Sequence, residues 1–275
     1  MAKGKLIVLE GIDGSGKSSQ YRRLCARMER DGIEYNHIVF PRYDKESSAL
    51  IRMYLGGEFG SRPSDVNAYA ASTFYAVDRY AAYRTDWGKL YEQGGLILSD
   101  RYTTSNAVHQ GSKLPDEELP AFFAWLSDLE YGKMGLPKPD LVIYLDVDVE
   151  TSLARMRRRQ EKTHTSADIH EKDLAYLERC LHTADKAADF YGWTRIPYRK
   201  NGVERELDEN PVHSGVGVQA VNQREQIRLG RIGGEGMNMG DKTHLLAGAR
   251  LVAHIDLGGG VLPHNHNRES GRKPV

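Results

Sequence analysis

The 275-residue sequence has few cysteines, no long apolar run and no excess of one charge. Its two cysteines, Cys25 and Cys180, lie far apart, which argues against a disulfide framework and indicates a reduced, cytoplasmic protein. No apolar run approaches the roughly 18 residues that a membrane span needs. The 38 basic side chains are balanced by 38 acidic ones, which argues against a mainly electrostatic nucleic-acid binder. We therefore expect a soluble protein that binds neither membrane nor nucleic acid.

The last part of the chain, residues 211–275, lacks aromatic residues altogether. All 24 aromatic residues lie at or before Tyr198, whereas this stretch holds 12 of the 28 glycines and five of the ten histidines. Such a composition cannot build the core that the preceding residues can. We expect one domain over residues 1–210 and a flexible Gly/His-rich tail over residues 211–275.

The pattern of the first 210 residues predicts alternating strands and helices. Short apolar runs typical of buried strands occupy residues 6–9, 37–40, 96–99 and 141–145, with a weaker one at 193–198. Helical periodicity follows residue 18 and returns at residues 68–83, 117–131 and 150–160. This alternation favours an α/β fold with a parallel sheet, in which ligands bind at the carboxyl ends of the strands.

A phosphate-binding motif follows the first predicted strand. Residues 11–18, GIDGSGKS, fit the pattern G-x-x-x-x-G-K-[ST] between a strand and a helix. Glycines let successive N–H groups face phosphate oxygens, Lys17 places a charge on the β- and γ-phosphates, and Ser18 offers a magnesium ligand. We predict that ATP and Mg²⁺ bind here, through Gly11, Asp13, Gly14, Ser15, Gly16, Lys17, Ser18 and Ser19.

The remaining residues favour a kinase over a GTPase. A GTPase needs an N-K-x-D segment that reads guanine, and the nearest candidate, residues 240–242, lies in the aromatic-free tail without the pattern. Arginines instead follow predicted strands or occupy helices, at Arg42, Arg79 and Arg101. Arginine presents several donors in a fixed fork and suits a second phosphorylated substrate.

These residues resemble the thymidylate kinase family, over roughly residues 3 to 205. The resemblance consists of the phosphate-binding loop, a Phe-Pro-Arg segment ending at Arg42, an aromatic-x-x-x-Arg helix ending at Arg79, the Asp-Arg-Tyr beginning at Asp100, a Pro-Asp-Leu before the fourth strand, and an arginine-rich lid. It implies a P-loop fold of three layers, with a five-stranded parallel sheet and helices on both sides, a mobile lid, and commonly a homodimer.

The resemblance also implies a site for the acceptor nucleotide. Asp13 matches the family's acidic loop residue near the acceptor, and Arg42 would contact its phosphate. Arg79 would bind phosphate or base, and Tyr75, four residues before it, replaces the phenylalanine that stacks on thymine. Either Ser105 or Asn106 would present a polar group near the base.

Asp100 and Arg101 follow the third predicted strand and would act at its mouth. Asp100 would position Mg²⁺ or its water, or orient the acceptor phosphate, and Arg101 would clamp that phosphate. Both are expected to be catalytic, as is Lys17.

The lid is predicted at about residues 155–172. The loop carries Gly14 and Ser15 and no arginine of its own, and in such family members the lid supplies the catalytic arginine. Arg155 and Arg159 are the two candidates, and the sequence does not choose between them. A lid that closes over ATP brings positive charge to the transferred phosphoryl group and excludes water.

Together these features predict a phosphotransferase that makes ADP and dTDP from ATP and dTMP. Two alternatives stay open: another nucleotide or nucleoside kinase of the same fold, and a nucleotide-binding regulatory protein without turnover.

Overall fold

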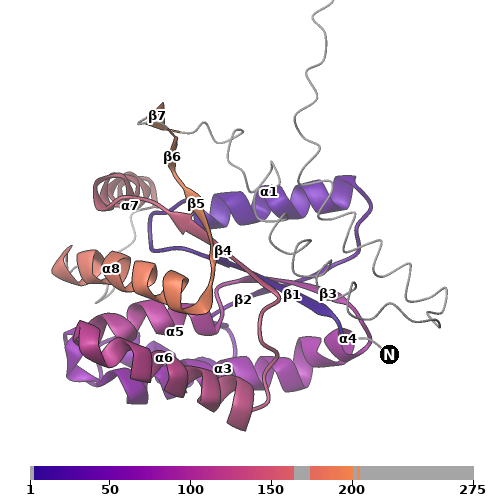
Figure 1. Cartoon of the computed structure of the whole chain (residues 1–275), viewed down its shortest axis with the longest axis horizontal. Helices are drawn as coiled ribbons and strands as arrows, with labels where there is room; N and C mark the ends of the chain where they lie inside the picture. Colours follow the sequence, from indigo (N-terminus) through magenta and orange to yellow (C-terminus); the bar gives the residue numbers. More distant parts are fainter. Residues whose placement is uncertain (1–2, 164–173, 201–202, 205–275) are drawn as a thin grey trace, which may run out of the picture.

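A five-stranded parallel sheet forms the centre of the molecule (Figure 1). The computed structural model describes residues 3–163, 174–200 and 203–204. The strands lie in the order β2-β3-β1-β4-β5, so the predicted parallel α/β fold is confirmed. Their bounds are β1 Lys5–Glu10, β2 Asn36–Val39, β3 Leu96–Asp100, β4 Leu141–Asp146 and β5 Thr194–Pro197.

Helices cover both faces of this sheet and make a three-layer structure. In Figure 1, α1 lies on one face, whereas α3, α5, α6 and α8 lie on the other. The helices are α1 Lys17–Arg30, α2 Ala49–Leu55, α3 Ala68–Ala82, α4 Gly88–Glu92, α5 Thr103–His109, α6 Leu119–Ser127, α7 Val149–Thr163 and α8 Leu174–Tyr191. π-helical turns extend α3 over Tyr83–Trp87 and α6 over Asp128–Lys133. Short 3-10 turns span Glu46–Ser48, Pro63–Asp65, Gly111–Lys113 and Asp116–Glu118, and a small hairpin pairs β6 Arg199–Lys200 with β7 Val203–Glu204.

Strand β1 shows why the sheet needs cover on both sides. Successive side chains of a strand point to opposite faces. Leu6 and Val8 therefore pack with Trp87 on one face, while Leu9 packs with Leu24 of α1 on the other. Because both faces of β1 are covered, the strand has no polar face, and its sequence is a continuous apolar run.

Strand β2 differs from its prediction as a buried strand. Its residues are alternately half-buried and exposed, and Val39 is 46% exposed. The reason is its place at the edge of the sheet, where only β3 flanks it. Strand pairing and sheet order are long-range properties that an apolar run of four residues does not encode.

Four helices, α2, α4, α5 and α8, were not predicted. Helix α8 buries Tyr176, Cys180 and Ala184 against α5 and α6, in the largest apolar cluster. Its buried small residues weaken the periodic signal that larger apolar side chains would give. Helix α5 begins three residues after β3 and carries polar side chains toward the carboxyl end of the sheet.

Part of the predicted lid and all of the predicted tail lie outside the described residues. Helix α7 contains the start of the predicted lid, and residues 164–172 of that lid lie beyond it. The tail over residues 211–275 is likewise outside the described part of the chain. Among the described residues, no helix is both long enough and apolar enough to span a membrane.

Candidate active site

A cavity of about 680 Å³ opens at the carboxyl ends of the strands. Strands β1 and β3 run side by side, with Leu9 opposite Asp100, so the loop after β1 and the residues after β3 meet. Most of the predicted site residues line this cavity: Asp13, Gly14, Ser15, Gly16, Lys17, Ser18, Ser19, Tyr75, Arg79, Asp100, Arg101, Ser105, Asn106 and Arg155. Gly11 and Arg42 do not. Arg159 lies in α7, but its side chain is outside the described part of the structure.

The phosphate-binding loop has the backbone that its glycines allow. Gly14 and Gly16 adopt positive φ angles of 79° and 88°, and α1 begins directly after Gly16. A Cβ atom on Gly14 would lie 2.3 Å from the carbonyl oxygen of Ser152, so only glycine fits there. This turn, together with the start of α1, forms a concave backbone surface suited to anions.

Lys17 and Asp100 form a buried ion pair at the floor of the cavity. Lys17 Nζ lies 3.2 Å from Asp100 Oδ1, and the two residues are 8% and 7% exposed. Burial and the nearby Arg101 lower the pKa of Lys17, because both disfavour another positive charge. A phosphate bound here would offset this unfavourable environment.

The residues here fit a magnesium ion. Asp100 Oδ1 is buried and has no hydrogen-bond partner among the described residues, because its contact with Lys17 lacks hydrogen-bond geometry. Ser18 is exposed at the start of α1 and lines the same cavity. Mg²⁺ prefers such oxygen ligands, binds through one or two of them, and takes the rest from phosphates and water. No group of three or more His, Cys, Asp or Glu side chains that could hold a metal occurs in the described ranges.

Arg101 sits between two acidic residues of the first strand and loop. Its Nη2 donates to Asp13 Oδ1 at 2.5 Å, and its Nη1 lies 3.7 Å from Glu10 Oε1. Burial opposes its charge, but these carboxylates outweigh burial and raise the pKa of Arg101. Its backbone φ is +66°, a left-handed conformation that is uncommon for a residue other than glycine. The guanidinium is therefore charged and fixed at the wall of the cavity.

Glu10 was not identified from the sequence, although it organises this wall. It is fully buried and accepts hydrogen bonds from Gly11 N, Thr104 Oγ1 and Ser105 Oγ at 2.6 to 2.9 Å. The sequence carries one local sign of this role: Glu10 is an acidic residue that ends an apolar strand directly before the glycine-rich loop.

Arg79 is held by a second glutamate that the sequence did not reveal. Arg79 and Glu130 are 2% and 0% exposed and form two parallel hydrogen bonds of 2.6 Å each. Thr103 and Asn106 also donate to Glu130, at 2.7 and 3.3 Å. Burial disfavours the charge on Arg79, but Glu130 outweighs it and raises the pKa of Arg79. Glu130 lies in the π-helical turn after α6, 51 residues from Arg79, so no local pattern joins them.

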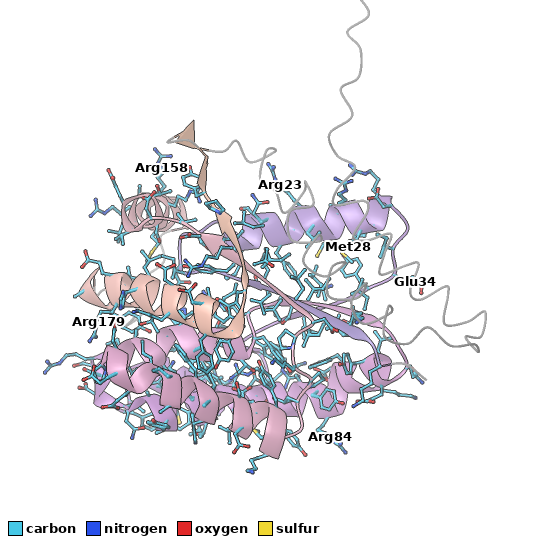
Figure 2. All side chains as sticks on the ribbon, in the orientation of Figure 1. Arg23, Met28, Glu34, Arg84, Arg158 and Arg179 are labelled. Carbon is cyan, nitrogen blue, oxygen red and sulfur yellow. The ribbon has the colours of Figure 1, made fainter. Side chains whose placement is uncertain are left out.

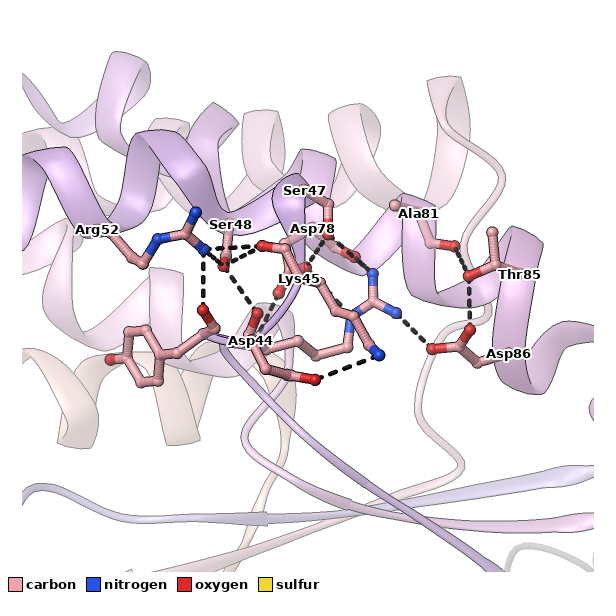
Figure 3. A network of polar contacts seen from close by, with 11 residues as sticks. Asp44, Lys45, Ser47, Ser48, Arg52, Asp78, Ala81, Thr85 and Asp86 are labelled. Carbon is pink, nitrogen blue, oxygen red and sulfur yellow. Dashed lines mark hydrogen bonds and ion pairs between the residues drawn. The ribbon is translucent and has the colours of Figure 1, made fainter.

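Arg42 is engaged away from the cavity wall. Its Nε donates to Asp78 Oδ1 at 3.2 Å, its Nη1 pairs with Asp86, and its Nη2 donates to Ser47 Oγ at 3.0 Å (Figure 3). The neighbouring Tyr43 lines the cavity instead. The structure thus places the Arg42 side chain in a network with α3 and the turn that follows it.

Helix α7 docks onto the phosphate-binding loop. Ser152 Oγ donates to the Asp13 carbonyl oxygen, and Arg155 Nη1 donates to the Ser15 carbonyl oxygen at 3.1 Å. The Arg155 guanidinium also lies 4.3 Å from the centre of the Tyr198 ring. Arg155 is therefore already beside the loop. Arg158, on the same helix and labelled in Figure 2, is exposed.

The aromatic residues of α3 divide as the sequence suggests. Tyr75 lines the cavity, whereas Phe74 packs between Tyr54 and Phe59, with ring centroids 6.4 and 5.7 Å away. Of these two neighbouring rings, Tyr75 is thus the one that lines the cavity.

The parallel sheet and the glycine loop that leads into a helix define a P-loop nucleotide-binding protein. A family model described as thymidylate kinase matches residues 9–207. The chain belongs to the thymidylate kinase family.

Individual relatives agree with this assignment. The chain is similar to thymidylate kinase of Mycobacterium tuberculosis, with 34% identity over 176 residues that cover 63% of this chain and 81% of the relative. It is 30% identical to human thymidylate kinase over 180 residues, covering 66% and 76%. A solved thymidylate kinase structure from Candida albicans shares the fold, with a TM-score of 0.56, 20% identity, and coverage of 86% of this chain and 96% of that one.

Proposed function

We propose that the protein transfers the γ-phosphoryl group of ATP to dTMP, giving ADP and dTDP. The observation that carries this proposal is the single cavity in which a phosphate-binding loop faces a second set of cationic and aromatic side chains. Lys17 belongs to the first set, and Arg101, Arg79 and Tyr75 belong to the second. Two phosphorylated substrates in one cavity are what a transfer between them requires.

On the donor side, the loop and Lys17 would hold the ATP phosphates. Arg155 already contacts the loop through Ser15, so a small movement of α7 would bring its charge to the γ-phosphoryl group. We assign the lid's catalytic role to Arg155 because of this contact. Positive charge on both sides of the transferred group stabilises the transition state.

On the acceptor side, Arg101 would clamp the dTMP phosphate beside Asp13. Tyr75 would stack on the thymine ring, and Arg79 and Asn106, both tied to Glu130, would face the base. The acceptor phosphate is an anion at neutral pH, so the reaction needs positioning and charge neutralisation rather than a covalent enzyme intermediate.

Ser18 and Asp100 are the residues that would hold Mg²⁺. The ion supplies charge neutralisation between the ATP phosphates. Asp100 would also keep Lys17 at the floor of the cavity, 3.2 Å away.

A coupled ADP-release assay tests the proposal. The protein is given ATP and Mg²⁺ with each of dTMP, dUMP, UMP, CMP, AMP, GMP and thymidine. We expect release that depends on dTMP. Release with another acceptor would keep the kinase and change its substrate, and no acceptor-dependent release would contradict the kinase function.

The domain and assembly predictions belong to the same proposal. Residues 1–210 would form the kinase domain and 211–275 a tail that activity does not need, in a cytoplasmic homodimer. Exposed apolar side chains on α3, Val77 and Tyr80, are compatible with a protein contact. Truncation after Asn210, assayed for turnover and by light scattering for mass, tests both parts.

A further inference from the structure

His109 is a cavity residue that neither the motif nor the proposed mechanism uses. It ends α5, and its ring lies between the cavity and α8. Nε2 is 3.1 Å from Arg101 Nη1, and Nδ1 is 3.3 Å from the Tyr176 hydroxyl. Cys180 Sγ also lies 3.6 Å from Nδ1, so Nε2 faces Arg101 in the cavity and Nδ1 faces α8.

Hydrogen-bond accounting fixes the proton on this ring. Arginine has donors and no acceptor, so His109 Nε2 must accept from Arg101. A neutral imidazole whose Nε2 accepts carries its proton on Nδ1, and that proton points toward the Tyr176 hydroxyl, 3.3 Å away. Both contacts are satisfied by one form only, the neutral imidazole with its proton on Nδ1.

We propose that His109, in this neutral form, is a positioning residue that orients the Arg101 guanidinium for the acceptor phosphate. The inference depends on the proposed function, in which Arg101 binds that phosphate. His109 fixes Nη1, Ser105 Oγ lies 3.3 Å from the same nitrogen, and Asp13 fixes Nη2. A guanidinium held at both ends presents its remaining N–H groups in one direction.

This arrangement makes acceptor use sensitive to acid. A second proton, on Nε2, would set an N–H group and a positive charge against Arg101, and the guanidinium would move toward Asp13 and Glu10 on its other side. Tyr176 and Cys180 face the ring from α8, and both stay protonated at neutral pH, because burial raises the pKa of Cys180 to about 12 and that of Tyr176 well above its usual value. They offer His109 no negative charge.

A direct test of the arrangement is the tautomer of His109 in the full-length protein. Long-range ¹H–¹⁵N NMR spectra of the wild type and of His109→Gln identify its resonances. We expect a protonated Nδ1 and an unprotonated Nε2 at pH 7.5. A proton on Nε2 at that pH would overturn the inference.

Kinetics test its consequence, with His109→Gln as the variant that keeps an acceptor and His109→Leu as the one that removes it. At pH 8 we expect kcat/KM for dTMP to fall about tenfold or more in His109→Leu, a loss of about 1.4 kcal/mol, with KM for ATP unchanged. His109→Gln should recover most of this loss. His182→Gln, an exposed histidine on the same face of the sheet, is the matched control and should behave as wild type.

The pH profile separates positioning from structure. The second proton of the dTMP phosphate binds near pH 6 and produces an acid limb in every variant. Wild type should show an additional protonation in kcat/KM for dTMP that His109→Gln lacks. Identical profiles, or an active His109→Leu, would overturn the inference. A wild-type protein that is inactive with dTMP would instead contradict the proposed function.

Discussion

The two sides of the cavity are built differently. On the donor side, the backbone forms the site: glycines of the loop take positive φ angles, and the start of α1 follows directly. On the acceptor side, paired side chains form it, with Arg79 on Glu130 and Arg101 on Asp13. A backbone site can be encoded in eight consecutive residues, whereas a side-chain site needs partners far apart in the chain.

This contrast predicts that removing the buried partner of an acceptor-side arginine costs stability, whereas removing a donor-side charge costs turnover. Glu130→Ala should have the largest effect, because it leaves the charge of Arg79 buried without its partner. We expect the free energy of unfolding to fall by about 3–5 kcal/mol, measured by urea denaturation. Glu130→Gln should cost less, since its amide oxygen can still accept from Arg79. A loss below 1 kcal/mol for Glu130→Ala would mean that the acceptor side does not depend on this pair.

Lys17→Met should show the opposite pattern. The side chain keeps its volume, and burial and Arg101 already disfavour the Lys17 charge, which offsets the loss of its pairing with Asp100, so the free energy of unfolding should change little. Turnover should fall on the order of 10²–10³-fold, as for the loss of one donor to the transition state. Steady-state kinetics with dTMP measure it, with the exposed Lys45→Met as control. A stability loss as large as that of Glu130→Ala would remove the distinction between the two sides.

Arg155→Ala tests whether α7 belongs to the donor side. We expect kcat to fall about tenfold, equivalent to 1.4 kcal/mol of transition-state stabilisation, with KM for dTMP unchanged. Arg158→Ala, three residues further along α7 and exposed, should leave kcat as in wild type. Equal effects of the two substitutions would show that only the overall charge of the helix matters.

The smallest effect concerns Lys113, which lies in the short turn after α5. Its amine is held by two neutral oxygens. It donates to the Tyr54 hydroxyl and to the Val66 carbonyl oxygen, at 2.9 Å each. Burial lowers the pKa of Lys113 to about 7, from 10.5 in the unfolded chain. Between these values the unfolded chain binds more protons, so the free energy of unfolding should rise with pH.

Lys113→Met should lack that rise. Urea denaturation of both proteins at pH 7, 8 and 9 measures the difference. We expect wild type to gain on the order of 1 kcal/mol relative to the variant across this range, after allowance for solvent screening. Parallel pH dependences would show that Lys113 keeps its charge in the folded protein.

The sequence predicted the donor side better than the acceptor side because consecutive residues build the donor side, whereas residues far apart in the chain build the acceptor side. The strand, loop and helix of residues 5–30 are local, and the fold class follows from their repetition along the chain. Glu10, Glu130 and His109 act through partners that only the sheet order and the packing of α5, α6 and α8 bring together. Arg42 is the opposite case, in which a local pattern pointed to the site. Its position after a strand predicted a place at the cavity, but its side chain pairs with Asp78 and Asp86 instead.

The left-handed backbone of Arg101 has a consequence for engineering. A non-glycine residue in this conformation carries strain of about 1–2 kcal/mol, which glycine would relieve. Asp13 and the buried Glu10 offset this strain, because Arg101→Gly would leave their carboxylates without the cation between them. A screen that rewards heat resistance alone should therefore keep the guanidinium that the cavity needs, because at this position stability and activity depend on the same ion pairs.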